Sequence, residues 1–239
     1  MDMLMGDQIA AARLRDWRKL AQGLHTRFLI NDFGTGARLV VAVGVAGDAF
    51  GHHPTVSIGK GYVDLKLVTA DAIYREDDGT EHVVEWVTQL DIDLARRISD
   101  IAAEHGVEAD PAAVSHIELG LDTARSATIA PVWAALLTGR ADSQGRGTPG
   151  DEIRDATGRV PNLWFGDADE QEGHGQRFHV EVYVAAEEAE RRIAAVVAAG
   201  GEVVDDTNAP GLTVFADQDG NRGIVCSDRF ANHDDVTSA

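Results

Sequence analysis

Two adjacent histidines, His52 and His53, precede Pro54 in the stretch GHHPTVSIGKGYVDLKLVTAD. A residue before proline favours extended backbone, and successive side chains of an extended segment point to opposite faces. The pair is therefore poorly placed to hold one metal ion, and no His-x3-His or Cys-x2-Cys spacing lies nearby. Acid–base chemistry suits the two imidazoles better, because an imidazole titrates near neutral pH. Two ordinary polar residues at a turn are the alternative.

Two further histidines, His116 and His179, stand near the start of the strand-like stretches SHIEL and FHVEV, 63 residues apart. A helical stretch and then further strand-like runs follow each of them. The order strand, helix, strands therefore occurs twice in the second half of the chain. This pattern indicates an internal duplication.

Charge and composition limit the classes of partner. The net charge of −19 over 239 residues argues against nucleic acid and anionic membrane as main partners, because both require clustered Lys and Arg. The sequence contains no run of about 18 apolar residues, so we expect no membrane span. Its first residues lack the pattern of a signal peptide. Cys226 is the single cysteine, which excludes an intrachain disulfide. We expect a cytoplasmic protein.

The first half of the chain alternates between helical and strand-like periodicity. Thr88 is suited to cap a helix, and Asp91 occupies the position that closes a capping box. The helix over 34–51 is so apolar that we expect it to be more fully buried than the others. The predicted elements are a helix over 7–22, a strand over 25–33, the helix over 34–51, a hairpin over 55–68, a surface loop over 74–82 and a helix over 88–106.

The second half follows an acidic, proline-bearing stretch that we interpret as a linker. Its predicted elements are strands over 114–122, 160–167, 177–185, 211–217 and 223–228, with helices over 123–139 and 186–204. We therefore expect an α+β protein of two domains, residues 1–106 and 113–230, joined by a linker at 107–112 and followed by a disordered tail at 231–239.

Residues 10–106 resemble the pterin-4a-carbinolamine dehydratases, small α+β enzymes that remove water from 4a-hydroxytetrahydropterins such as the tetrahydrobiopterin form. The resemblance rests on DWRKL in the first helix, on FLINDF, on an acidic residue before HHP, on YVDLKLVTAD, and on VTQLDIDLARRI, which matches a family pattern L-T-x-x-D-x-x-L-A. It implies an antiparallel sheet with helices on one face. It also implies that His52, His53 and Asp71 are catalytic and that Asp48, Pro54 and Thr69 bind the substrate.

The implied reaction takes a proton from N5 of the pterin and delivers one to the departing 4a-hydroxyl. One of His52 and His53 would remove the proton, and the other, or a water molecule, would donate it; Asp71 would orient an imidazole or a pterin nitrogen. Ala70 stands where the family usually has a histidine, and the following loop is longer than usual. His82 in that loop is a candidate to supply the missing imidazole.

Residues 113–229 resemble the glyoxalase-like branch of the vicinal oxygen chelate superfamily, in which paired βαβββ modules form a cup around a small molecule. Metal-binding members use four strand positions, which here fall at His116, Asn162, His179 and Ile224. Asparagine is a weak ligand and isoleucine is none, so we expect no metal in this domain. We expect His116, Asn162, Trp164 and His179 to bind substrate instead.

These resemblances imply that the protein is a lyase. The expected activity is that of a 4a-hydroxytetrahydropterin dehydratase, and the second domain is expected to be a glyoxalase-like domain that binds a small molecule. They imply a pterin as substrate, no cofactor, and a homodimer or homotetramer. The alternative is a catalytically degenerate dehydratase-like module for binding or assembly. In that case the glyoxalase-like domain would be the main small-molecule site.

Overall fold

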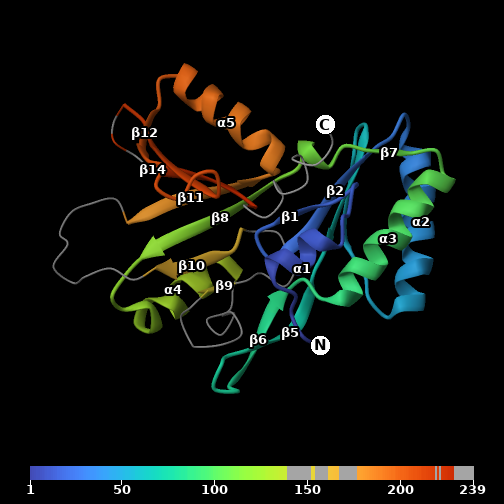
Figure 1. Cartoon of the computed structure of the whole chain (residues 1–239), viewed down its shortest axis with the longest axis horizontal. Coiled ribbons are helices and arrows are strands. Elements are labelled where there is room, and N and C mark those ends of the chain that lie inside the picture. The colour runs from blue at the N-terminus through green and yellow to red at the C-terminus, as the bar shows by residue number, and fades with distance from the viewer. Residues whose placement is uncertain (139–151, 154–160, 167–176, 219, 221, 229–239) are drawn as a thin grey trace. The chain divides into compact units, whose positions relative to one another are not determined.

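The computed structural model describes residues 1–138, 152–153, 161–166, 177–218, 220 and 222–228 (Figure 1). These residues form two compact units, the first mainly Met1–Ser115 and the second mainly His116–Tyr183 with Ala189–Ser227. Both units combine helices with mostly antiparallel sheets, so the expected α+β class is confirmed.

The first unit is built on an antiparallel sheet in the order β1-β2-β4-β3, with β7 also paired to β2. Helices α2 and α3 cover one face of it, and alternate residues of β2 and β4, such as Phe28 and Leu65, meet Leu39 and Ile98 of the helices in one core. The elements are α1 (Gly6–Ala11), β1 (Arg18–Leu20), β2 (Gly23–Leu29), α2 (Phe33–Phe50), β3 (Thr55–Gly59), β4 (Tyr62–Leu67), β5 (Thr69–Arg75), β6 (Glu81–Trp86), α3 (Gln89–Glu104) and β7 (Glu108–Ala109).

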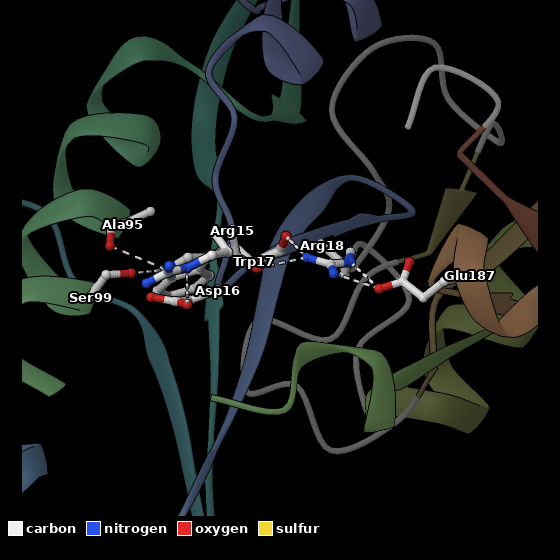
Figure 2. A network of polar contacts seen from close by, with 7 residues as sticks. All are labelled: Arg15, Asp16, Trp17, Arg18, Ala95, Ser99 and Glu187. Carbon is white, nitrogen blue, oxygen red and sulfur yellow. Dashed lines mark hydrogen bonds and ion pairs between the residues drawn. The ribbon is translucent and has the colours of Figure 1, made fainter. Parts of the chain in front are cut away.

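The helix expected over 7–22 is wrong beyond Ala11. The chain turns at Arg13, whose φ is 50°, and residues 18–20 form β1 instead. Trp17, which looked like part of a helical stripe, is buried and donates its indole N–H to the carbonyl of Ala95 at 3.2 Å and to Ser99 at 3.3 Å (Figure 2). A long-range contact of one aromatic side chain thus outweighs the local helical pattern.

Two other expectations of the first half are corrected. Residues 107–112 are not a free linker, because β7 pairs with β2 and Asp110 donates its N–H to the carbonyl of Arg27 at 2.7 Å. The extra loop after Ala70 is a two-stranded hairpin, β5–β6, whose turn lies between Arg75 and Glu81. The Met3 N–H donates to the carbonyl of Ile73, and the Ile73 N–H donates to the carbonyl of Met1, so the N-terminal residues are tied to this hairpin.

Helix α2 is less buried than its composition predicts. Leu39 and Val43 are almost fully buried, whereas Val41 and Val45 are 68% and 66% exposed. Of the helices that the structure describes, α2 alone is long and apolar enough to cross a membrane by length and composition. Its inner face nevertheless lies in the core of the first unit. The prediction of a more fully buried helix failed because α2 is apolar on all sides, whereas the core of the first unit covers only one of its faces.

The second unit contains a seven-stranded sheet in the order β12-β13-β14-β11-β8-β10-β9. Its second half has the order β-α-β-β-β that the resemblance implies, and the two halves meet where β11 lies beside β8. Leu121 and Leu163 of one sheet face pack against Ala134 of α4. The elements are β8 (Ser115–Asp122), α4 (Ser126–Thr138), β9 (Glu152–Ile153), β10 (Leu163–Gly166), β11 (Phe178–Val184), α5 (Ala186–Ala198), β12 (Glu202–Asp205), β13 (Leu212–Ala216) and β14 (Arg222–Ser227). The tail expected at 231–239 lies outside the described residues.

Candidate functional site

The loop between α2 and β3 places His52 and His53. Gly51 ends α2 in the left-handed region at φ 62°, and the N–H of His52 donates to the carbonyl of Gly47 at 3.1 Å. A Cβ at Gly47 would lie 2.6 Å from Cδ2 of His53 and 3.0 Å from the carbonyl oxygen of His52. The absence of a side chain at Gly47 therefore lets the histidine loop pack directly against the end of the helix.

The two imidazoles bind different carboxylates. His52 Nε2 lies 2.7 Å from Asp91 Oδ1, and this pair is buried, with side chains 13% and 0% exposed. His53 Nε2 lies 2.9 Å from Asp48 Oδ1, and this pair is at the surface, with side chains 54% and 81% exposed. The loop thus presents one buried and one solvent-facing histidine–carboxylate pair.

Both oxygens of the Asp91 carboxylate have hydrogen-bonding partners. Its Oδ2 accepts from the backbone N–H of Thr88 at 2.8 Å, from the hydroxyl of Thr69 at 2.7 Å and from the hydroxyl of Thr88 at 3.1 Å. A carboxylate in this setting accepts only, so the nitrogen of His52 that faces it is the protonated one. In its neutral form His52 therefore has its proton on Nε2 and its lone pair on Nδ1, which is the tautomer of a general base acting through Nδ1.

Asp91, and not Asp71, is the carboxylate that contacts His52. Asp71 is exposed on β5, in a stretch where the β5–β6 register is irregular, and Ala70 beside it is exposed as well. The sequence identified Asp91 only as the third residue of the α3 capping box, a role that it also fills. The family pattern L-T-x-x-D contained the signal, because its aspartate falls at Asp91, on the helix that faces the histidine loop.

His82 does not supply the missing imidazole. It lies opposite Tyr74 in the β5–β6 hairpin, stacks on that ring with centroids 6.2 Å apart, and bonds Glu76 at 2.6 Å. Thr69, by contrast, is where a site residue was expected: it is buried and reaches Asp91 directly. Pro54 follows the two histidines and opens the segment that leads into β3.

The second unit gathers a separate polar cluster on the central strands of its sheet. His116 and Glu118 lie two apart on β8, and His179 and Glu181 lie two apart on β11, so each pair shares a face. His116 Nε2 lies 3.7 Å from Glu118 Oε1, and His179 Nε2 lies 3.9 Å from Glu181 Oε1. Asn162 donates to Glu118 at 3.3 Å. Sequence reasoning identified both histidines and missed both glutamates, although His-x-Glu is itself the repeated motif.

Aromatic side chains enclose this cluster. The Tyr183 hydroxyl donates to Glu181 Oε2 at 2.9 Å, and the Trp164 ring meets the His179 ring edge to face, with centroids 5.2 Å apart. The His179 ring lies against the backbone of Gly120, where a Cβ would be 2.3 Å from Nε2. The expected lining residues His116, Asn162, Trp164 and His179 are therefore brought together, whereas Ile224 lies on β14 and offers no donor atom.

Burial changes the acid–base properties of this cluster. Desolvation raises the pKa of Glu181, against the hydrogen bond from Tyr183 that lowers it. Burial, followed by the nearby charges of Glu181 and Glu118, raises the pKa of Cys226 to about 12 and also raises that of the Tyr183 phenol. In the described part of the chain, no three His, Cys, Asp or Glu side chains are arranged to hold a metal ion.

Comparison with known proteins agrees with the boundary between the two units. The family described as Pterin 4 alpha carbinolamine dehydratase matches residues 3–101, and the glyoxalase-like domain family matches residues 118–226. Over 91 residues the chain is 32% identical to a protein of Thermosynechococcus vestitus that bears pterin-4-alpha-carbinolamine dehydratase as a provisional name. The match covers 38% of this chain and 83% of that protein.

The chain belongs to the pterin-4a-carbinolamine dehydratase family. Its dehydratase-family domain is fused to a glyoxalase-like domain, as the sequence predicted. Among solved structures, a transcriptional coactivator/pterin dehydratase from Brucella melitensis is similar at 25% identity with a TM-score of 0.34, over 42% of this chain and 99% of that one. An NAD-dependent benzaldehyde dehydrogenase from Legionella pneumophila is similar at 14% identity with a TM-score of 0.35, over 46% of this chain and 97% of that one.

Proposed function

We propose that the dehydratase-family domain eliminates water from a 4a-hydroxytetrahydropterin, with His52 as the general base. The observation that supports this proposal is the buried bond between His52 and Asp91, which fixes the imidazole in one tautomer. This bond orients the imidazole before any substrate binds, and general acid–base catalysis further requires the N5 proton to lie within hydrogen-bond reach of Nδ1. Thr69 and Thr88 hold Asp91, so both are positioning residues.

The proposed reaction balances as follows. Nδ1 of His52 takes the proton of N5, and the N5 electron pair forms the C4a=N5 bond while the C4a–O bond breaks. The hydroxyl leaves as water after it receives a proton from protonated His53 or from solvent. Asp48 stabilises that imidazolium through its 2.9 Å contact with His53 Nε2. Ala70 can donate nothing, so we expect a turnover rate of order 10²-fold below that of a three-histidine site.

The experiment is a direct assay of the purified protein. A 4a-hydroxytetrahydropterin is generated in place, and formation of the quinonoid dihydropterin is followed by absorbance. We expect acceleration over buffer that His52→Ala abolishes and that the control variant His82→Ala preserves, because His82 bonds only within the hairpin. Absence of any acceleration by the folded wild-type protein would refute the proposal and leave the domain a binding or assembly module.

A second function is favoured by the cluster in the glyoxalase-like domain. Burying Glu118 and Glu181 on the central strands is costly unless they are hydrogen-bonded, and groups with perturbed pKa values, such as Glu181, concentrate at functional sites. We propose that this cluster binds a small molecule through hydrogen bonds. Thermal-shift measurements with pterins, thiol adducts of α-ketoaldehydes and divalent metal ions would identify the class, since a ligand of the native state raises Tm.

Two controls sharpen that experiment. Glu181→Gln keeps the size of the side chain and removes its charge, so it should eliminate the shift produced by a ligand of the cluster, whereas Glu104→Gln at the surface of α3 should not. Metal analysis of the purified protein tests the expectation of no metal. Near one equivalent of Fe, Mn, Zn or Ni that is lost in His116→Ala would overturn it.

A further inference from the structure

Strands β8 and β11 of the second unit are neighbours in its sheet, and two contacts fix how their residues pair. A Cβ at Gly120 would lie 2.3 Å from Nε2 of His179, and the rings of His116 and Tyr183 have centroids 6.4 Å apart. Residue numbers therefore rise along β8 as they fall along β11, so the two strands are antiparallel. The two glutamates of the polar cluster occupy the position midway between these contacts, which places them directly opposite each other.

This opposition of two buried carboxylates is costly. Glu118 and Glu181 are 3% and 7% exposed. Directly opposed side chains have Cβ atoms about 4.5–5.5 Å apart, and like charges at that position are destabilising. Desolvation raises the pKa of Glu181, and the charge of Glu118 adds to that rise. Groups that donate hydrogen bonds to such a pair offset both costs.

The donors that surround the pair are uncharged. The Tyr183 hydroxyl donates to Glu181 at 2.9 Å, the Trp164 indole also bonds Glu181, and Asn162 donates to Glu118 at 3.3 Å. The Nε2 atoms of the two histidines lie 3.7 and 3.9 Å from the glutamate oxygens, beyond hydrogen-bond distance. An ionised carboxylate accepts and never donates, so the centre of the cluster is rich in acceptors. A ligand that complements it must supply N–H donors.

A planar edge with two N–H groups meets this requirement best. Such an edge donates two parallel hydrogen bonds to one carboxylate, as the guanidinium of arginine does. The pyrimidine ring of a pterin has this edge, formed by N3–H and the 2-amino group. The thiol adduct of an α-ketoaldehyde instead presents oxygen atoms at its reactive end. In the described residues no three side chains are arranged for a divalent ion.

We propose that the glyoxalase-like domain binds a pterin, whose N3–H and 2-amino group donate to the opposed pair Glu118 and Glu181. This inference rests on the proposal that the polar cluster binds a small molecule, and it names the class of that molecule. Trp164 and Tyr183 stand beside the pair and offer aromatic surface against which a planar ring packs. Both domains of the chain would then bind the same class of molecule.

Pterin and lumazine are a matched pair of probes for this edge. Lumazine has the same two rings but carries an oxygen in place of the 2-amino group, so it offers one N–H at that edge instead of two. Binding to the purified, histidine-labelled protein is followed by NMR, in which His179 reports the cluster and His52 reports the dehydratase site. We expect pterin to shift the His179 signal, and lumazine to bind there at least about tenfold more weakly, because a site built for N–H donors rejects an analogue that lacks one.

Three variants complete the design. Glu118→Gln and Glu181→Gln should each raise the Kd of pterin at the cluster at least about tenfold, because a hydrogen bond to a charged acceptor is stronger than one to a neutral acceptor. Glu104→Gln, at an exposed residue of α3, should leave that Kd unchanged. Circular dichroism verifies that each variant is folded, and the comparison of pterin with lumazine at His179 requires only the wild type.

The outcomes separate this inference from the proposals on which it builds. Equal affinity of the cluster for pterin and lumazine, or an unchanged Kd in both glutamate variants, would overturn it. A His179 signal that responds to the thiol adduct of an α-ketoaldehyde and not to pterin would also overturn it, while small-molecule binding by the cluster would stand. Failure of the dehydratase reaction would leave the response of His179 to pterin intact.

Discussion

Asp91→Asn provides the sharpest test of how the dehydratase site is built. An asparagine has one acceptor oxygen and one amide group that donates. At Asp91 the oxygen must replace Oδ2, because three donors from Thr69 and Thr88 converge there. The amide group then replaces Oδ1 and points at His52 Nε2, 2.7 Å away in the wild type. Two donors cannot face each other, so the proton of His52 must move to Nδ1.

The consequence for activity is large, and the consequence for folding is modest. The variant retains the shape of the side chain and the three hydrogen bonds to Oδ2, and the fourth is reversed in direction without the charge of the carboxylate, so we expect a loss of about 1–3 kcal/mol of stability. The base, however, loses the lone pair on the nitrogen that would receive the N5 proton. General acid–base catalysis contributes roughly 10²–10⁴-fold, and kcat should fall by that factor while KM changes little.

Two measurements address the tautomer and the rate separately. Nitrogen NMR of labelled protein should show His52 protonated on Nε2 in the wild type and on Nδ1 in Asp91→Asn. Steady-state kinetics should show the loss of kcat, with Asp93→Asn as control, since Asp93 is exposed on the same helix and bonds only Gln89 and Arg96. A wild-type His52 with its proton on Nδ1, or a fully active Asp91→Asn, would refute the reasoning.

Three further outcomes follow from the same structure. Gly47→Ala should displace the histidine loop and lower activity at least about tenfold, because its Cβ would lie 2.6 Å from the His53 ring; circular dichroism should still show a folded protein. Cys226 should react with a thiol reagent at pH 8 roughly 10³-fold more slowly in the native than in the urea-unfolded protein, because burial raises its pKa to about 12; equal rates would contradict that burial. Glu181 has a folded-state pKa above its unfolded value, so its contribution to stability is present at low pH and is lost as pH rises through the folded pKa. The Tm of Glu181→Gln should therefore rise relative to that of the wild type between pH 4 and pH 8. Parallel Tm profiles of the two proteins over this pH range would contradict the raised pKa.

The sequence predicted most elements where periodicity and caps agree, and it failed where long-range contacts decide. The α3 helix follows from the Thr88 cap and its apolar stripe, and the structure confirms both. The first helix breaks at Arg13 because Trp17 is drawn to the backbone of α3, a contact 78 residues away that no local pattern encodes. The exposed side of α2 could not be predicted either, since an all-round apolar helix gives no indication of which face is covered.

The site was predictable in its residue types and less so in its pairings. The HHP motif located both histidines, but which carboxylate serves which imidazole depends on how α3 packs against the loop. The sequence therefore indicated Asp91 only as a cap and Asp71 as an orienting group, whereas in the structure Asp91 both caps α3 and contacts His52, and Asp71 is exposed on β5. In the glyoxalase-like domain the two glutamates were visible two residues after each histidine. Neither glutamate falls at one of the four family ligand positions, so only the alternation of side chains along each strand indicates that they share a face with the histidines.

The meeting of β8 and β11 has a consequence for any molecule that binds there. Aligning the two His-x-Glu motifs places Gly120 at the position of Tyr183, two residues beyond each glutamate. Gly120 leaves room for the His179 ring against bare backbone, whereas Tyr183 places a phenol 6.4 Å from the His116 ring. A duplicated motif by itself would give a site with two equivalent ends, in which a ligand could bind in either direction. This single glycine–tyrosine difference makes the two ends chemically distinct, so a ligand that binds there would bind in one direction.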